Sequence, residues 1–202
     1  MTALFSTAYL PPIAYIAALA KHEEVLIEAK ETFPKQTYRN RTVIMTAGGV
    51  RTLTVPVIRT NHSRTEEVHI DHKERWNIVH LRTLTAAYSA SPYFLYYKDE
   101  LEMLLTAHYD RLIELNQALL VWCTKKLKIN CNISLTSDWL PLTGAPTDYR
   151  NAFSPKHPDT TFEYEPYYQV FNDRLPFTPN LSIIDLLMNI GPEARYYLKG
   201  IS

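Results

Sequence analysis

The first thirty residues constrain the fold most, because two strand-like stretches flank a helical one. Residues 3–10 ("ALFSTAYL") and 24–30 ("EVLIEAK") favour strands, and residues 13–22 ("IAYIAALAKH") fit a short buried helix that begins after Pro11–Pro12. This order predicts a βαβ unit with two parallel strands. It places residues 9–12 ("YLPP") at the carboxyl end of the first strand, the edge where open α/β sheets tend to bind ligands.

A hairpin is predicted next, over residues 41–57 ("RTVIMTAGGVRTLTVPV"). Apolar residues alternate with threonines in both halves, and Gly48-Gly49 supplies the positive φ angles of a tight turn. Residues 67–70 ("EVHI") favour a further short strand, and residues 132–135 ("NISL") favour one that returns to the sheet.

Two helices are predicted in the middle of the chain. The first covers residues 71–90, where Asp71 and Glu74 have the spacing of a capping box. The second runs from Asp99 to about Lys128, because leucines recur through it at intervals of three and four residues.

The last third of the chain alternates between loop and helix. Residues 136–179 are rich in proline and aromatic residues, and such a long stretch should contain short strands or a functional loop. Ser182 caps a helix that starts "IIDLLMN", with Asp185 as the return partner of a capping box, and Gly191-Pro192 precedes a last helical turn. We therefore predict one α/β domain over residues 1–202, a small mixed sheet with an N-terminal βαβ unit and hairpin packed against several helices.

Composition excludes some classes of function. The 202 residues carry a formal net charge of zero, with a sequence pI near 7.1, which argues against duplex DNA as the main partner. A local cluster of cations can still bind a small anion. Walker, Rossmann, G-x-S-x-G, H-E-x-x-H and C-x-x-C patterns are all absent, so the sequence specifies no cofactor. The histidines at 69, 72 and 80 match no metal-ligand spacing, and we expect no metal site.

The compartment is predicted from three features. No apolar run reaches the roughly 18 residues of a membrane span, and the apolar N-terminal segment lacks the basic start of a signal peptide. Cys123 and Cys131, the two cysteines, are expected to be reduced structural thiols. We expect a soluble protein of the cytoplasm.

The segment before the hairpin is the first candidate site. Residues 35–41 ("KQTYRNR") combine Lys35, Arg39 and Arg41 with Tyr38 and Asn40. An arginine there could hold a phosphate or carboxylate through two hydrogen bonds, with Asn40 binding a polar group. If the segment is extended, alternation puts both arginines on one side. The alternative is a solvated loop with a turn-forming asparagine.

Other candidates lie near strand ends and helix starts. Tyr9 could stack on a base or sugar, or belong to the core. His80 could act as a general base, Asp71 could move a proton or cap a helix, and Trp76 shares the inward face with His80. Tyr93 could line a cleft or pack between helices. Aromatic residues of 162–171 ("FEYEPYYQVF") could stack on a sugar or base against an edge strand.

Several blocks together resemble one family. They are "YLPP" at 9–12, "YRNRTVI" at 38–44, "LTVPV" at 53–57, "IDHKERW" at 70–76, "SPYF" at 91–94 and "PNLSIIDLLMNIGP" at 179–192. In this order they resemble the WbqC-like family over nearly the whole chain. The resemblance implies a bacterial protein, and some members are associated with O-antigen and other surface-polysaccharide pathways.

Two classes of function fit these observations. The first is an enzyme of surface-polysaccharide or activated-sugar metabolism, an acyl or aminoacyl transferase that binds a small anionic or nucleotide-linked sugar substrate. The second is a non-catalytic binding or assembly protein with an aromatic and basic cleft. Binding of single-stranded RNA is a third option, because arginine and tyrosine can stack on bases. The oligomeric state stays open.

Overall fold

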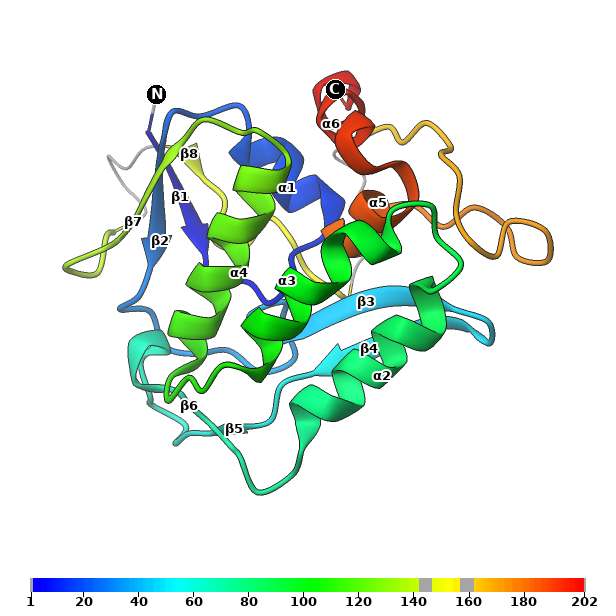
Figure 1. The fold of residues 1–202 in the computed structure, drawn as a ribbon. Helices are drawn as coiled ribbons and strands as arrows, with labels where there is room; N and C mark the ends of the chain where they lie inside the picture. Colours follow the sequence, from blue (N-terminus) through cyan, green and yellow to red (C-terminus); the bar gives the residue numbers. More distant parts are fainter. Residues whose placement is uncertain (1, 142–146, 157–161, 202) are drawn as a thin grey trace.

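A four-stranded parallel sheet stands at one side of the molecule (Figure 1). The computed structural model describes residues 2–141, 147–156 and 162–201. The sheet has the order β7-β2-β1-β8, with bounds Asn132–Leu135, Glu24–Glu28, Thr2–Ser6 and Thr147–Asp148. Helix α1 (Ile13–Leu19) connects β1 to β2, and the two strands pair in parallel. The predicted βαβ unit and mixed α/β class are confirmed.

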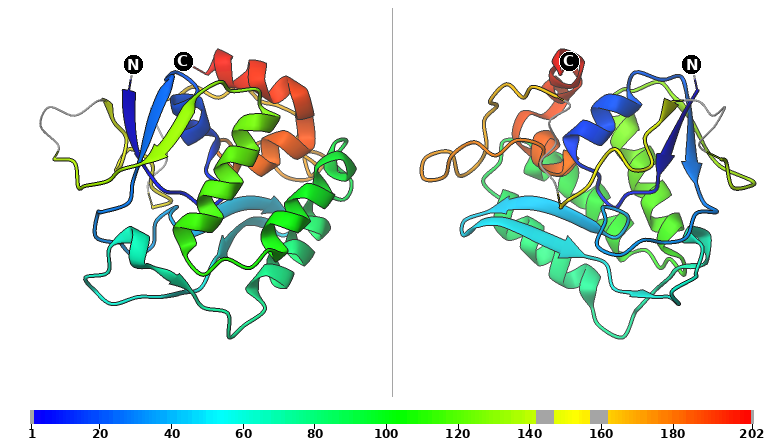
Figure 2. Two further views of the ribbon diagram at one scale, coloured as in Figure 1. Left: turned by 60° about the vertical axis from the view of Figure 1, so that its left-hand side comes forward. Right: turned by 180° about the vertical axis from the view of Figure 1, so that it is seen from behind.

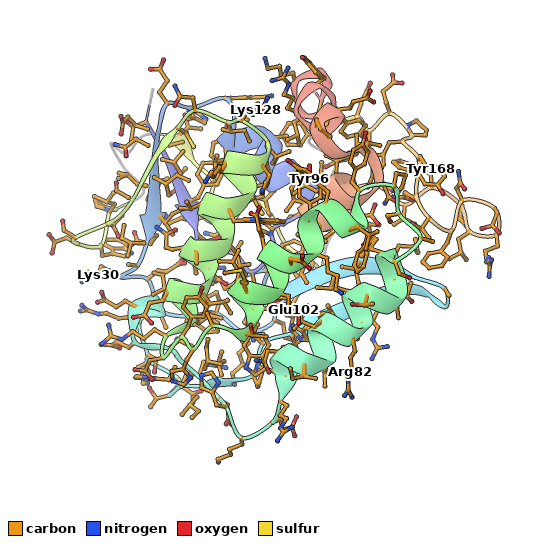
Figure 3. All side chains as sticks on the ribbon, viewed as in Figure 1. Lys30, Arg82, Tyr96, Glu102, Lys128 and Tyr168 are labelled. Carbon is orange, nitrogen blue, oxygen red and sulfur yellow. The ribbon has the colours of Figure 1, made fainter. Side chains whose placement is uncertain are left out.

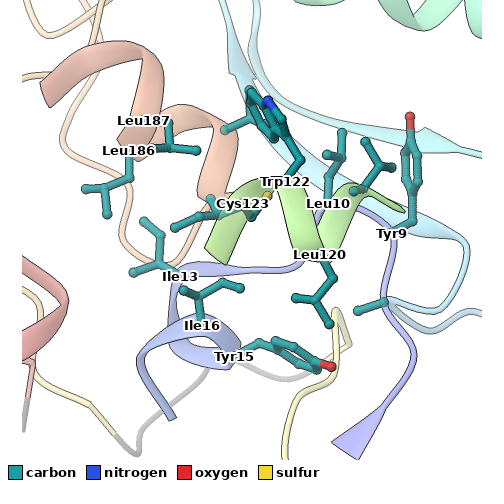
Figure 4. Packing of buried hydrophobic residues seen from close by; sticks show 14 of the residues in the cluster. Tyr9, Leu10, Ile13, Tyr15, Ile16, Leu120, Trp122, Cys123, Leu186 and Leu187 are labelled. Atoms are coloured by element: carbon teal, nitrogen blue, oxygen red, sulfur yellow. The ribbon is translucent and has the colours of Figure 1, made fainter. Parts of the chain in front are cut away.

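Helices α1 and α4 (Leu112–Lys126) cover the same side of this sheet (Figures 1 and 2). Successive right-handed crossovers that move in one direction along a sheet require this arrangement. Phe5 of β1 packs on Tyr15 of α1, with ring centroids 4.9 Å apart. The core continues between helices: Figure 4 shows side chains of α1, α4 and α5 (Ile183–Ile190) meeting, including those of Ile16, Leu120 and Leu186.

The predicted hairpin is present as β3 (Arg41–Thr46) and β4 (Gly49–Thr54). It forms a ladder of its own, packed against α2 (Trp76–Tyr88) and α5. Gly49 has φ +99°, whereas Gly48 does not have a positive φ, so one glycine rather than two serves the turn. The strand predicted at residues 67–70 is present as β6 (His69–Ile70) and pairs with β5 (Val57–Ile58).

Helix α2 begins later than predicted. Its first residue is Trp76, and Asp71 caps no helix: its Oδ1 accepts a hydrogen bond from the Lys73 amide at 3.0 Å, in the turn before the helix. The helix predicted from 99 to 128 is also wrong, because the chain forms α3 (Phe94–Thr106) and α4 with a break between them.

Pairing with β6 explains this break. The Ile70 amide donates to the Asp110 carbonyl, and the Leu112 amide donates to the Val68 carbonyl, each at 3.0 Å. These strand-like contacts use backbone groups that a continuous helix would keep for itself. Ala107 accordingly ends α3 in an extended conformation.

The C-terminal part holds α5, a 3₁₀ turn (η2, Gly191–Glu193) and α6 (Ala194–Gly200), and a second 3₁₀ turn (η1, Thr65–Glu67) precedes β6. Ser182 caps α5 as predicted, its Oγ accepting from the Ile184 amide at 3.4 Å. The predicted capping-box role of Asp185 is wrong, because its carboxylate accepts hydrogen bonds from the hydroxyls of Tyr88 and Tyr167 instead. Described residues from 162 to 171 form no strand.

Strand β7 is the one predicted at residues 132–135, and β8 is the short strand expected within the 136–179 segment. Over the ranges that the structure describes, no helix has the length and apolar character needed to cross a membrane.

Candidate functional site

The order of the strands places a switch point between β1 and β8. From β1 the chain crosses through α1 to β2 on one side, whereas β8 pairs with β1 on the other side. In open α/β sheets, ligands bind outside the carboxyl ends of strands at such a point. The segments that leave these two strand ends are residues 7–12 and 149–156. Figure 2 shows the second segment descending from β8 to the hairpin.

The "YLPP" segment connects this edge to the hairpin and α5. Leu10 has φ +43°, a left-handed conformation that costs a leucine about 1–2 kcal/mol. Its carbonyl accepts two hydrogen bonds, from Thr42 Oγ1 at 2.7 Å and from Ser182 Oγ at 3.0 Å. The Tyr9 amide donates to the Tyr38 carbonyl at 2.8 Å. The hydrogen bond between Tyr9 and Tyr38 therefore holds the segment that carries Tyr38 close to the end of β1.

A pocket of about 450 Å³ lies next to these segments. Aromatic, polar and aliphatic side chains line it, including those of Tyr38, Tyr164, Lys156, Asn180 and Val43. Its walls come from the segment after β8, the hairpin and residues 178–181. Its volume is in the usual range for small-molecule sites, and its lining combines ring faces with an ammonium group and an amide.

Arg41 lies on the same strand as Val43, a residue of the pocket lining. Side chains alternate along a strand, so Arg41 shares a face of β3 with Val43, which lines the pocket. Its Nε is buried, and no described residue accepts a hydrogen bond from it. Lys35 is exposed to solvent. Of the predicted basic segment, Tyr38 lines the pocket, whereas Arg41 is not among the lining residues and shares only a strand face with Val43.

Arg39 and Asn40 are engaged elsewhere. Residues 36–40 turn, with Gln36 at φ +60°, so the extended segment that would align the arginines is absent. Arg39 is 4% exposed, and its Nε and Nη2 each donate to Glu31 at 2.8 Å. Asn40 Nδ2 donates to the Val55 carbonyl at 2.9 Å.

A buried ion cluster joins the carboxyl ends of β2 and β8. Glu28 is fully buried, and its Oε2 accepts from Arg150 Nη1 at 3.0 Å. Arg150 Nη2 donates to Asp148 Oδ2 at 2.7 Å, and this hydrogen bonding holds the pKa of Asp148 below its usual range. Thr136, after β7, donates to Glu28 Oε1 at 2.8 Å. Figure 3 marks Lys30, which follows β2 and pairs with Glu66 at 2.9 Å.

This cluster is not evident from any local stretch of the sequence. Glu28 was an ordinary residue of a predicted strand, and Arg150 lies 122 positions further along the chain. The available signal was a carboxylate that directly follows three apolar residues at the carboxyl end of a strand. Among the residues that the structure covers, no group of three His, Cys, Asp or Glu side chains gathers as metal ligands.

The predicted catalytic residues lie apart from the pocket lining. His80 is 3% exposed, and its Nδ1 is 2.8 Å from the Tyr9 hydroxyl. The imidazole also makes a hydrogen bond to the backbone of Thr54. Burial lowers the pKa of His80 to about 4. Trp76 packs edge-on to both rings, and its buried Nε1 lacks a partner among the described residues. Asp71 occupies the turn before α2.

Tyr93 is at another interface. Its amide donates to the Met188 carbonyl at 3.1 Å, and its ring covers Gly191, where an added Cβ would lie 2.5 Å from the ring. Two further grooves flank α3, of about 470 Å³ towards α2 and 380 Å³ towards α4, on the face that carries Arg82 and Glu102 in Figure 3. None of the predicted site residues is among the side chains that line them.

A parallel sheet with an aromatic and basic pocket near its switch point defines a small α/β protein with a candidate ligand site. The chain belongs to the WbqC-like protein family, whose model matches residues 7–153 and 150–197. It is 29% identical over 224 residues to the uncharacterized protein Rv1507c of Mycobacterium tuberculosis (strain ATCC 25618 / H37Rv), with 98% of this chain and 96% of that protein covered. No solved structure matches the chain.

Proposed function

We propose that this protein binds an anionic sugar substrate in the Tyr38–Tyr164 pocket and acts in bacterial surface-polysaccharide or activated-sugar metabolism, in the cytoplasm. One observation carries the proposal: two tyrosines and a lysine line one pocket near the switch point of the sheet. Ring faces of tyrosine suit the apolar face of a sugar, and an ammonium group suits a phosphate or carboxylate.

Arg41 supports the anionic character of the substrate. A guanidinium donates to two oxygens of a phosphate or carboxylate at once, which fixes orientation as well as charge. Arg41 shares a face of β3 with the lining residue Val43, and its Nε has no hydrogen-bond acceptor among the described residues. The family association with surface polysaccharides makes a nucleotide-linked sugar or sugar phosphate the substrate class to test first.

Thermal shift and calorimetry of purified protein test this proposal. The ligands are nucleotides, nucleotide sugars, sugar phosphates and acyl-CoA thioesters. A ligand at 100 times its Kd adds about 2.7 kcal/mol to the free energy of unfolding, which raises Tm by several degrees. We expect one sugar class to bind, and Tyr164→Leu, Lys156→Gln and Arg41→Gln to weaken it. Tyr168→Leu is the matched control, since Tyr168 is exposed on the same loop (Figure 3). Uniformly flat results across all classes would refute the proposal.

Transfer of an acyl or aminoacyl group to an amino sugar is the second candidate function. It requires a group that frees the amine and donors that stabilise a developing oxyanion. Lys156 and the tyrosines of the pocket favour it, because an ammonium group and hydroxyl groups can donate hydrogen bonds to a developing oxyanion. The catalytic roles of His80 and Asp71 stay predictions, to be tested by the pH profile of transfer in His80→Gln and Asp71→Asn. Binding without any product from an acyl-CoA and an amino sugar would favour the non-catalytic alternative.

A further inference from the structure

Asp185 lies buried beneath the loop that forms one wall of the pocket. It belongs to the first turn of α5 and is 1% exposed. Its Oδ1 accepts from the Tyr88 hydroxyl at 2.9 Å, and its Oδ2 accepts from the Tyr167 hydroxyl at 2.6 Å and from Gln169 Nε2 at 3.2 Å. The carboxylate therefore joins α2 on one side to the 162–178 loop on the other.

Gln169 extends this contact to the pocket wall. Its Nε2 donates to the Thr178 carbonyl at 2.9 Å, and its Oε1 accepts from the Thr178 amide at 3.0 Å. Thr178 itself lines the pocket. One side chain thus holds both backbone groups of a wall residue, in the way that a neighbouring strand would.

The other end of the wall is held by α1. The Ala14 amide donates to Asn180 Oδ1 at 2.9 Å, and the Ile13 amide donates to the Leu181 carbonyl at 3.0 Å. Asn180 has φ +52°, so this short segment is bent between its two anchors. Residues 178–181 are consequently placed by Gln169 at one end and by α1 at the other.

The hydrogen bonds of Asp185 require both oxygens of its carboxylate. Burial raises the pKa of Asp185, and its hydrogen bonds to Tyr167, Tyr88 and Gln169 act in the opposite direction. An amide at this position would have one acceptor oxygen instead of two. It could not accept from Tyr88 on one side and from Tyr167 and Gln169 on the other, so one set of donors would lose its partner.

We infer that Asp185 is a positioning residue that, through Gln169, sets the 178–181 wall of the pocket without contacting the ligand. This inference rests on the proposed function for its effect on binding. The cluster also explains the aromatic and amide residues of the 162–171 segment, of which Tyr167 and Gln169 serve the anchor while Tyr164 faces the pocket.

Two variants and one control test this inference. Asp185→Asn and Gln169→Leu should each raise the Kd of the sugar ligand about tenfold, equivalent to about 1.4 kcal/mol. Both should also accelerate hydrogen exchange of the Thr178 amide, read by NMR without ligand. Tyr88→Phe is the control, because it removes a hydrogen bond from the same carboxylate on the side away from Gln169. It should lower Tm and leave the Kd and Thr178 exchange within about twofold.

The outcomes separate a positioning role from a merely structural one. Lower Tm in all three variants, with unchanged Kd and unchanged Thr178 exchange, would overturn the inference. If Asp185→Asn fails to fold, Gln169→Leu still decides, because it breaks the contact to Thr178 directly. Wild-type protein that binds no sugar would refute the proposed function. Hydrogen exchange of the Thr178 amide would still test whether Asp185 and Gln169 position the pocket wall.

Discussion

Arg39 and Glu31 form a two-pronged ion pair, in which Nε and Nη2 of the guanidinium each donate to the carboxylate at 2.8 Å. Arg39 is 4% exposed and Glu31 14%, so water screens the pair weakly. Because the basic segment before the hairpin was predicted to bind ligand, this pairing changes what a substitution there should do.

Arg39→Ala should therefore cost stability, about 3 kcal/mol, since it leaves a largely buried carboxylate without its partner. Burial already raises the pKa of Glu31 and Arg39 lowers it, so the variant should raise this pKa further. The deficit against wild type should then be larger at pH 8 than at pH 5. Urea unfolding at both values measures it, with exposed Lys35→Ala as a control that changes stability by less than about 0.5 kcal/mol.

The burial of His80 predicts a pH dependence of stability. The pKa of His80 is lowered to about 4 from 6.5, so between these values the unfolded chain binds more protons than the folded one. Stability should rise with pH across this window, and up to about 3 kcal/mol from this group should be lost as pH falls through it.

Urea unfolding from pH 4 to 7.5 tests this. The free energy of unfolding should rise more steeply with pH for wild type than for His80→Gln. Replacement of the exposed His62 by glutamine is the matched control. Equal slopes for wild type and His80→Gln would show that His80 does not cause the dependence.

Gly191→Ala should destabilise the protein strongly. Its φ is +55°, and a Cβ there would lie 2.5 Å from ring carbons of Tyr93. The left-handed conformation and the overlap together cost about 3 kcal/mol. Gly200→Ala, which meets nothing within 4 Å, should change Tm little. Calorimetry that found the two variants equally stable would contradict this packing of Tyr93 on Gly191.

A glycine should improve the end of α4. Lys128 follows the C-cap residue Leu127 and has φ +52°, where glycine avoids the strain of a side chain. Lys128→Gly should stabilise the protein by about 0.5 kcal/mol, after the larger entropy loss of glycine is subtracted. Lys125→Gly, in the last turn of the same helix, should instead lose about 1 kcal/mol. In chemical denaturation, the free energy of unfolding should increase for Lys128→Gly and decrease for Lys125→Gly. Changes of the same sign would contradict the prediction.

Local patterns carried the prediction of most elements. The βαβ unit, the hairpin and the Ser182 cap each depend on residues within one short segment, so alternation, spacing and capping residues were enough. The break between α3 and α4 could not be read this way, because the leucine spacing continues through it. It depends on backbone pairing of Asp110 and Leu112 with residues some forty positions earlier.

The candidate site was less predictable for the same reason. Tyr38 and the aromatic residues of 162–171 are both predicted to meet a ligand, but nothing local indicates that Tyr38 and Tyr164 share a pocket. Arg39 and Arg41 look alike in sequence, and only the position of Glu31 in the fold distinguishes the buried ion pair from the arginine that shares a strand face with Val43. Asp185 had the spacing of a cap, and its actual partners, Tyr88 and Tyr167, come from distant segments.

The four-stranded sheet ends in a short strand at each of its two edges. Strand β8 spans two residues, and β7 spans four and includes the polar residues Asn132 and Ser134. Long, flat, apolar edges recruit strands from other molecules, because they present a row of unused backbone groups. Edges this brief offer little template for such addition. The same two-residue strand that positions the pocket segment beside β1 therefore also limits edge-to-edge pairing of this sheet with other molecules.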